Sequence, residues 1–160
     1  MIRFMYALPT ALLAAACTSV SQLAPPDRDA ARRAVVDLLT ETESAAARSD
    51  VDGVVAGFTD DAVSEPADVP PLVGKASIDG FYRPLYDGFN IDLHHEILEA
   101  EPVGTVVVHR GRSYGTLVPK SGGEPQAFEL VYLAVLKWTA DSSLRFWRVM
   151  SHPASVTPGT

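Results

Sequence analysis

Cysteine is almost absent from this sequence, because Cys17 is the only one among 160 residues. An intrachain disulfide is therefore excluded. Basic residues are also scarce: 13 Lys and Arg stand against 20 Asp and Glu, which gives a formal net charge of −7. An acidic surface repels phosphate backbones, and pairs such as Arg110 with Arg112 are too few to offset it. Nucleic acid is therefore not an expected partner.

Long hydrophobic runs are missing as well. The apolar run at residues 4–16 is interrupted by Pro9 and Thr10. It is shorter than the roughly 20 apolar residues that cross a bilayer. It follows Arg3 and precedes three alanines, which is the arrangement of a secretory signal with its cleavage site. The sequence therefore predicts an exported protein.

The sole cysteine follows those alanines directly and resembles the lipidated cysteine of a bacterial lipobox. Residues 1–17 are then a signal peptide, Cys17 is the lipidation site, and the protein is anchored to a membrane of the cell envelope. The same alanines could serve an ordinary signal peptidase, which would leave a soluble periplasmic or secreted protein. Residues 18–27 are predicted to form a tether and residues 154–160 a loose tail.

Several kinds of site have no motif here. No Gly-x-Ser-x-Gly elbow, phosphate-binding loop or zinc motif is present. His94 and His95 are adjacent on a predicted strand, so they point to opposite faces and cannot chelate one ion together. No metal and no cofactor is expected.

The first half of the mature chain has helical periodicity. Apolar residues recur at helical spacing within residues 28–48, with Asp27 or Asp29 as N-cap. Asp50 is expected to cap a second helix that ends at Phe58, and residues 62–65 form a short extended piece. A third helix is predicted over residues 76–87, where Pro84 should kink it or end it early.

The second half has strand character. Apolar and polar residues alternate along residues 89–97, and further strands are predicted over 106–118, 128–138 and 144–152. Helices followed by consecutive strands predict one α+β domain over residues 28–153. Three helices on the concave face of a bent antiparallel sheet would make a cone with room for a pocket.

Two segments resemble the SnoaL-like and ketosteroid-isomerase-like members of the nuclear-transport-factor-2-like superfamily. They are SDVDGVVAGFTDDAV and PPLVGKASIDGFYRPL, and the closing FWRVMSHP is similar to the last strand of that superfamily. The resemblance covers about residues 30–153. It implies the cone-shaped fold, which hosts isomerases, dehydratases and non-enzymatic binding modules.

The resemblance also allows the general base of the ketosteroid isomerases to be sought by position. That carboxylate precedes a proline, and Glu65 before Pro66 takes its place here. The oxyanion donors do not carry over, because Thr42 and Ala134 stand near their positions. Without those donors an enolate gains little stabilisation.

The remaining candidates are aromatic or imidazole side chains on elements that could line the cone. They are Phe81, His109, Tyr132, Trp147 and His152. His95 lies on the apolar face of its strand with Leu93 and Ile97, which is typical of a satisfied histidine near the core.

Two functions follow from this reading. The favoured one is binding of a small apolar molecule or of an envelope protein partner, without catalysis. The alternative is an isomerase or dehydratase that uses Glu65 as general base with a pocket histidine. Whether the protein is an enzyme is left open, and a homodimer is expected through the apolar outer face of residues 128–138.

Overall fold

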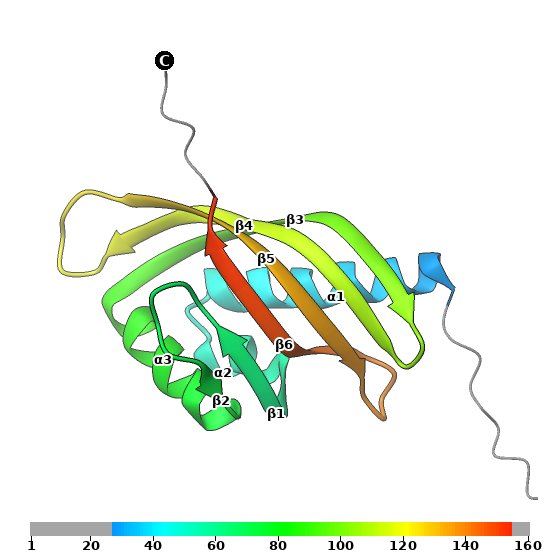
Figure 1. Cartoon of the computed structure of the whole chain (residues 1–160). Helices are drawn as coiled ribbons and strands as arrows, with labels where there is room; N and C mark the ends of the chain where they lie inside the picture. Colours follow the sequence, from blue (N-terminus) through cyan, green and yellow to red (C-terminus); the bar gives the residue numbers. More distant parts are fainter. Residues whose placement is uncertain (1–26, 155–160) are drawn as a thin grey trace, which may run out of the picture.

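The structure, a computed structural model, describes residues 27–154. Three helices cover one face of a six-stranded sheet in this part of the chain (Figure 1). The helices are α1 (Arg28–Ala47), α2 (Val51–Ala56) and α3 (Lys75–Gly88). The predicted α+β cone is thereby confirmed. The signal peptide, Cys17 and nearly all of the tether and tail lie outside the described residues, so those assignments stay predictions.

Two aspartates start the first two helices as the sequence predicts. The side chain of Asp27 accepts a hydrogen bond from the backbone N–H of Ala30 at 2.6 Å, and Asp50 accepts one from Gly53 at 2.9 Å. Both carboxylates thus satisfy N–H groups that have no partner within the helix. Within the described residues, no helix has the length and apolar character needed to cross a membrane.

Helix α3 does not end early at Pro84, contrary to one of the two expectations, but runs on to Gly88. A proline inside a helix leaves the carbonyl four residues earlier, that of Gly80, without its usual donor. Gly80 and Pro84 are both exposed, so water can solvate that carbonyl. The helix therefore tolerates the proline.

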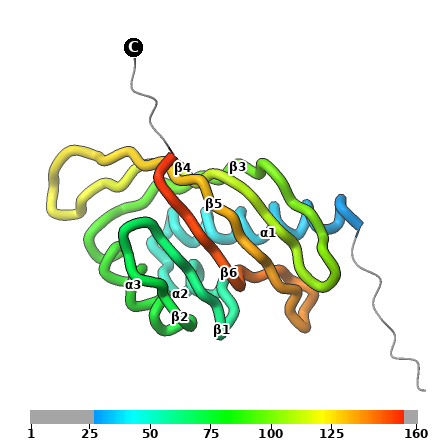
Figure 2. Tube along the Cα trace, in the orientation of Figure 1, coloured from blue at the N-terminus to red at the C-terminus, as the bar shows by residue number. Residues whose placement is uncertain are grey.

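The sheet has the order β2-β1-β6-β5-β4-β3. Along the chain, its strands are β1 (Phe58–Glu65), β2 (Leu72–Val73), β3 (Phe89–Val103), β4 (Val106–Pro119), β5 (Gln126–Trp138) and β6 (Leu144–Pro153). Every neighbouring pair is antiparallel except β1 and β6, which run parallel. Figure 2 shows these two strands side by side although they are far apart in the sequence.

The prediction that the second helix extends to Phe58 is wrong, because α2 ends at Ala56 and β1 begins at Phe58. The ring of Phe58 packs on that of Phe146 in β6, with 5.2 Å between the ring centroids. The backbone N–H of Phe146 also donates to the carbonyl of Gly57 at 2.8 Å. Contacts with a distant strand thus set the end of α2, which local periodicity does not reveal.

The space between helices and sheet has two unlike ends along strands β4 and β5. At the packed end, Val35 of α1, Val107 of β4 and Leu136 of β5 are completely buried. At the hollow end, Leu117 of β4 and Phe128 of β5 border a cavity.

Candidate functional site

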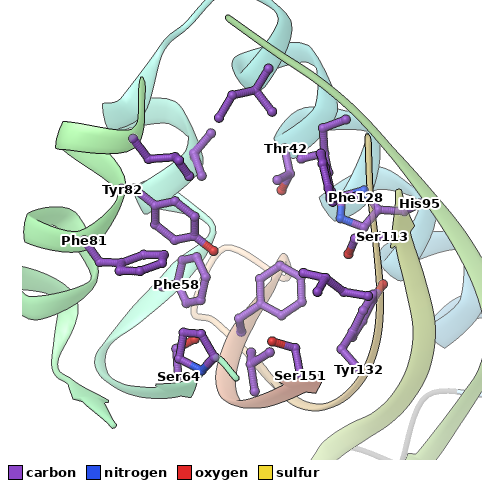
Figure 3. A pocket seen from close by; sticks show the side chains of 18 of the residues that line it. Thr42, Phe58, Ser64, Phe81, Tyr82, His95, Ser113, Phe128, Tyr132 and Ser151 are labelled. Carbon is purple, nitrogen blue, oxygen red and sulfur yellow. The ribbon is translucent and has the colours of Figure 1, made fainter. Parts of the chain in front are cut away.

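The hollow end of the cone contains a cavity of about 300 Å³ (Figure 3). Strands β3 to β6 form one wall, and α2 and α3 contribute to the other. Most of the lining is aliphatic or aromatic, including Val54, Phe58, Phe81, Leu85, Ile91, Phe128 and Phe146. A concave apolar site of this kind is typical of small-molecule binding.

The lining contains few polar side chains, and none of them is a carboxylate, an ammonium or a guanidinium group. Besides tyrosines, they are Thr42, Ser64, His95, Ser113 and Ser151, which Figure 3 labels. None of the lining residues is Asp, Glu, Lys or Arg. A charged ligand group that entered the cavity would lose its hydration and find no side chain of opposite charge in the wall. Its transfer from water would therefore cost free energy.

His95 is held at the cavity wall by Glu43 of α1. The Oε1 atom of Glu43 accepts the backbone N–H of His95 at 2.6 Å and lies 3.0 Å from its ring Nδ1. The side chain of His95 is 8% exposed and that of Glu43 is 33% exposed. Burial lowers the pKa of His95, and the contact with Glu43 opposes this shift.

His109 lies beyond the cavity wall and is completely buried. Its Nδ1 lies 2.7 Å from the backbone carbonyl of Glu99, and its Nε2 lies 2.8 Å from the hydroxyl of Tyr132. Because a carbonyl can only accept, Nδ1 carries the hydrogen and Nε2 accepts from the tyrosine. Burial lowers the pKa of His109 and raises the pKa of Tyr132. Both ring nitrogens are therefore occupied by protein groups.

The tyrosines of α3 add two further hydroxyl groups to the cavity. Figure 3 shows the hydroxyl of Tyr82 pointing into the open space, and Tyr86 also lines it. Burial raises the pKa of Tyr82 and raises the pKa of Tyr86 to about 12. Both side chains are therefore neutral near neutral pH and offer hydroxyl groups to a ligand.

Only some of the residues proposed from the sequence as pocket residues line the cavity. Phe81 and Tyr132 line the cavity, whereas His109 lies behind it. Glu65 is half-buried and is not a lining residue. Its neighbour Ser64 lines the cavity instead, and successive strand residues point to opposite faces. The position before Pro66 thus does not direct a carboxylate inward.

Trp147 and His152 also lie outside the lining. The pairing of β5 with β6 shifts between Val135 and Leu136, so Trp147 is an extra residue of β6. Its indole N–H donates to Asp61 at 3.0 Å, and Lys137 lies 3.7 Å from the centroid of its ring. His152 is exposed and lies opposite Val131 rather than opposite an inward residue.

Sequence reasoning missed His95 with Glu43 as the polar centre of the cavity. The alternation along β3 does place His95 on the inner face, beside Leu93. Nothing in the sequence links it to Glu43, which is 52 positions earlier. Only the packing of α1 across β3 brings the two side chains together.

A metal site requires a group of potential ligands in a suitable geometry. Within residues 27–154, no group of three His, Cys, Asp or Glu is arranged to hold a metal ion. The pair of His95 and Glu43 offers two ligands, which is fewer than the three or four that a protein zinc site uses.

Solved structures with a similar fold are numerous. A ketosteroid isomerase-like protein from Erwinia carotovora atroseptica is 25% identical, with a TM-score of 0.66 over 80% of this chain and 96% of that one. A conserved protein from Planctomyces limnophilus is 18% identical, with a TM-score of 0.69 over 79% and 100%. Aln2 from a Streptomyces species is 16% identical, with a TM-score of 0.68 over 81% and 94%.

Comparison with curated proteins finds no match. The profile of the SnoaL-like domain family, in contrast, matches residues 33–144. That range includes α1 from its second turn, α2, α3 and the sheet up to the start of β6. It therefore includes most of the residues that line the cavity. The chain belongs to the SnoaL-like domain family.

Proposed function

We propose that this protein binds a small, mainly apolar molecule in the cavity at the hollow end of the cone. The observation that carries the proposal is the cavity of about 300 Å³, walled by aromatic and aliphatic side chains and free of charged ones. Burial of an apolar ligand there would gain about 25 cal/mol for each Å² of apolar surface removed from water.

The test compares two adjacent residues of β6 that point in opposite directions. Ser151 lines the cavity, whereas Met150 is 59% exposed. Native mass spectrometry of the purified protein should reveal a bound small molecule, or calorimetry should detect binding of two-ring aromatic compounds. Ser151→Phe should abolish binding by filling the cavity, and Met150→Phe should not. Equal binding by both variants would place the ligand elsewhere.

A second candidate function is proton transfer at a carbon atom of the ligand. It is supported by the placement of His95 and Glu43 at the cavity wall, since such a pair can accept and return a proton. The likeness to a ketosteroid isomerase-like protein at 25% identity supports the same class. The base would then be His95 rather than Glu65, which is not a lining residue. Turnover of a bound ligand should be lost in His95→Gln and kept in Glu65→Gln.

We propose in addition that the protein is exported and anchored through a lipid on Cys17. The sequence of residues 1–17 supports this location. Replacement of Cys17 by Ser should move the mature protein from the membrane fraction to the soluble fraction. Equal membrane association of both forms would contradict the anchor.

We also propose a homodimer through the outer face of the sheet. Leu133 of β5 and Met150 of β6 are paired neighbours on that face. Leu133 is 50% exposed and Met150 is 59% exposed. Pairing of two copies would cover these apolar side chains. Light scattering should give twice the monomer mass at micromolar concentration, and Leu133→Glu should give the monomer mass.

A further inference from the structure

The ring of His95 is fixed in one orientation by a single carboxylate oxygen. Oε1 of Glu43 accepts the backbone N–H of His95 and also lies within hydrogen-bond distance of its Nδ1. An oxygen that accepts from the backbone can accept from the ring as well, but two lone pairs facing each other would repel. Nδ1 therefore carries the hydrogen, and Nε2 carries a lone pair when the ring is neutral.

The Nε2 atom of His95 has no protein partner among the described residues, since its ring bonds only through Nδ1. Within the same residues, Trp138 Nε1 is the one side-chain nitrogen or oxygen that is both buried and unpaired. Nε2 of His95 is therefore accessible, and the open space beside this residue is the cavity. A lone pair with fixed position thus faces a largely apolar chamber.

The serine hydroxyls of the lining do not fix whether a ligand group must donate or accept. Ser113, which lies opposite His95 on β4, and Ser151 on β6 carry hydroxyl groups that rotate and can donate or accept. The hydroxyl of Thr42 already donates to the carbonyl of Leu38 at 2.8 Å. The hydroxyl of Tyr132 likewise donates to Nε2 of His109. Thr42 and Tyr132 can therefore only accept from a ligand, as Nε2 of His95 does.

We propose that the cavity selects neutral ligands that carry a hydroxyl group on an apolar body, with the hydroxyl donating to Nε2 of His95. This inference rests on the proposed binding function and adds the chemical class of the ligand. A ketone, an ether or a carboxylate presents only acceptors, and an acceptor facing the lone pair of Nε2 is repelled. An alcohol or a phenol satisfies the nitrogen and leaves its apolar body against the aromatic wall.

The experiment uses three probes with the same two-ring body: 2-naphthol, 2-methoxynaphthalene and naphthalene. Only 2-naphthol can donate a hydrogen bond, and naphthalene shows the affinity of the apolar body alone. Calorimetry with the full-length protein should give 2-naphthol an affinity roughly tenfold above that of the other two, as one net hydrogen bond in a buried site allows. Equal affinities for all three probes would overturn the inference.

Two adjacent histidines provide the variant and its matched control. His95→Phe removes the acceptor and should make the affinities for 2-naphthol and naphthalene equal. His94→Phe changes the neighbour on the opposite face, whose side chain is 51% exposed, and should keep the preference. A preference that persists in His95→Phe would assign it to another residue and overturn the inference.

A measurement on the unaltered protein keeps the inference testable if His95→Phe does not fold. Side-chain ¹⁵N spectra should show His95 protonated at Nδ1 and unprotonated at Nε2, with the Nε2 signal shifted by 2-naphthol and not by naphthalene. The opposite tautomer would overturn the inference. Failure of all three probes to bind would instead contradict the proposed binding function itself.

Discussion

The packed end and the hollow end of the cone each contain a histidine from neighbouring strands, and the two differ in one respect. At the packed end, His109 uses both ring nitrogens, one toward the carbonyl of Glu99 and one toward the hydroxyl of Tyr132. At the hollow end, His95 uses one ring nitrogen toward Glu43 and leaves the other to the cavity. Both rings are shielded from bulk solvent, so burial alone does not distinguish them.

The difference teaches how a structural histidine is told from a functional one. A ring with both nitrogens bonded to the protein can offer nothing to a ligand without breaking a native hydrogen bond. A ring with one bonded nitrogen is oriented by that bond and remains able to accept another. The number of hydrogen bonds that a buried histidine still lacks therefore indicates a functional role better than its burial does.

The largest expected effect concerns stability at the packed end. Leu136 is completely buried, so Leu136→Ala should lower the free energy of unfolding by about 3 kcal/mol. Leu130, on the same strand, already borders the cavity and has fewer contacts to lose, so Leu130→Ala should cost less than half as much. Urea denaturation of both variants measures the difference. Equal losses would contradict the contrast between the two ends.

A smaller effect is expected from acidification. Burial lowers the pKa of His109 and of His95 below the ordinary value of 6.5. The unfolded chain therefore binds more protons than the folded one as the pH falls below 6.5, and proton binding favours unfolding. This stabilisation is present above that value and is lost as the pH falls toward the folded pKa values. The midpoint of urea denaturation should be lower at pH 5.5 than at pH 7.5.

A His109→Gln variant serves as the control for this pH dependence and should reduce it. The carboxyl groups of Asp61 and Asp141 do not interfere in this range. Hydrogen bonds from Thr59 to Asp61 and from Thr139 to Asp141 are the main cause that lowers both pKa values to about 2. Their own contribution to stability is lost only at more acidic pH.

The smallest effect is expected at Glu65. Its side chain belongs to neither end of the interior, because Ser64 occupies the inward position of β1. Glu65→Gln should therefore change the free energy of unfolding by less than about 0.5 kcal/mol. Binding of 2-naphthol, measured by calorimetry, should also be unchanged. Loss of binding in this variant would restore Glu65 as a residue of the site.

Periodicity predicts the parts of the fold that local sequence determines. Helix α1 and the inward face of β3, with Leu93 and His95, follow from spacing alone. The spacing leaves Asp27 and Asp29 as alternative caps, and the structure has Asp27. The boundary of α2 at Ala56 does not, because contacts of Phe58 with β6 decide it. Periodicity predicts helices packed on one face of an antiparallel sheet, and the resemblance to SnoaL-like domains adds the expectation of the specific cone-shaped fold.

The site is less predictable than the fold because it depends on geometry across the sheet. One extra residue in β6 changes the side to which Trp147 points, and strand alternation does not reveal such a bulge. A shift of one position separates Ser64, which faces inward, from Glu65. The contact between Glu43 and His95 depends on how α1 crosses β3 and has no local signal.

The parallel pairing of β1 with β6 has a consequence for folding kinetics. Ser64 of β1 and Val149 of β6 are paired residues that both line the cavity. Since β6 is the last strand of the part of the chain that the structure describes, the cavity cannot close until strands about 80 positions apart have paired, and such long-range pairing slows folding. A ligand that needs the closed cavity therefore binds only the native state and raises the stability of the entire domain. Hydrogen exchange should then slow on ligand binding at amides that open only by global unfolding, including those far from the cavity.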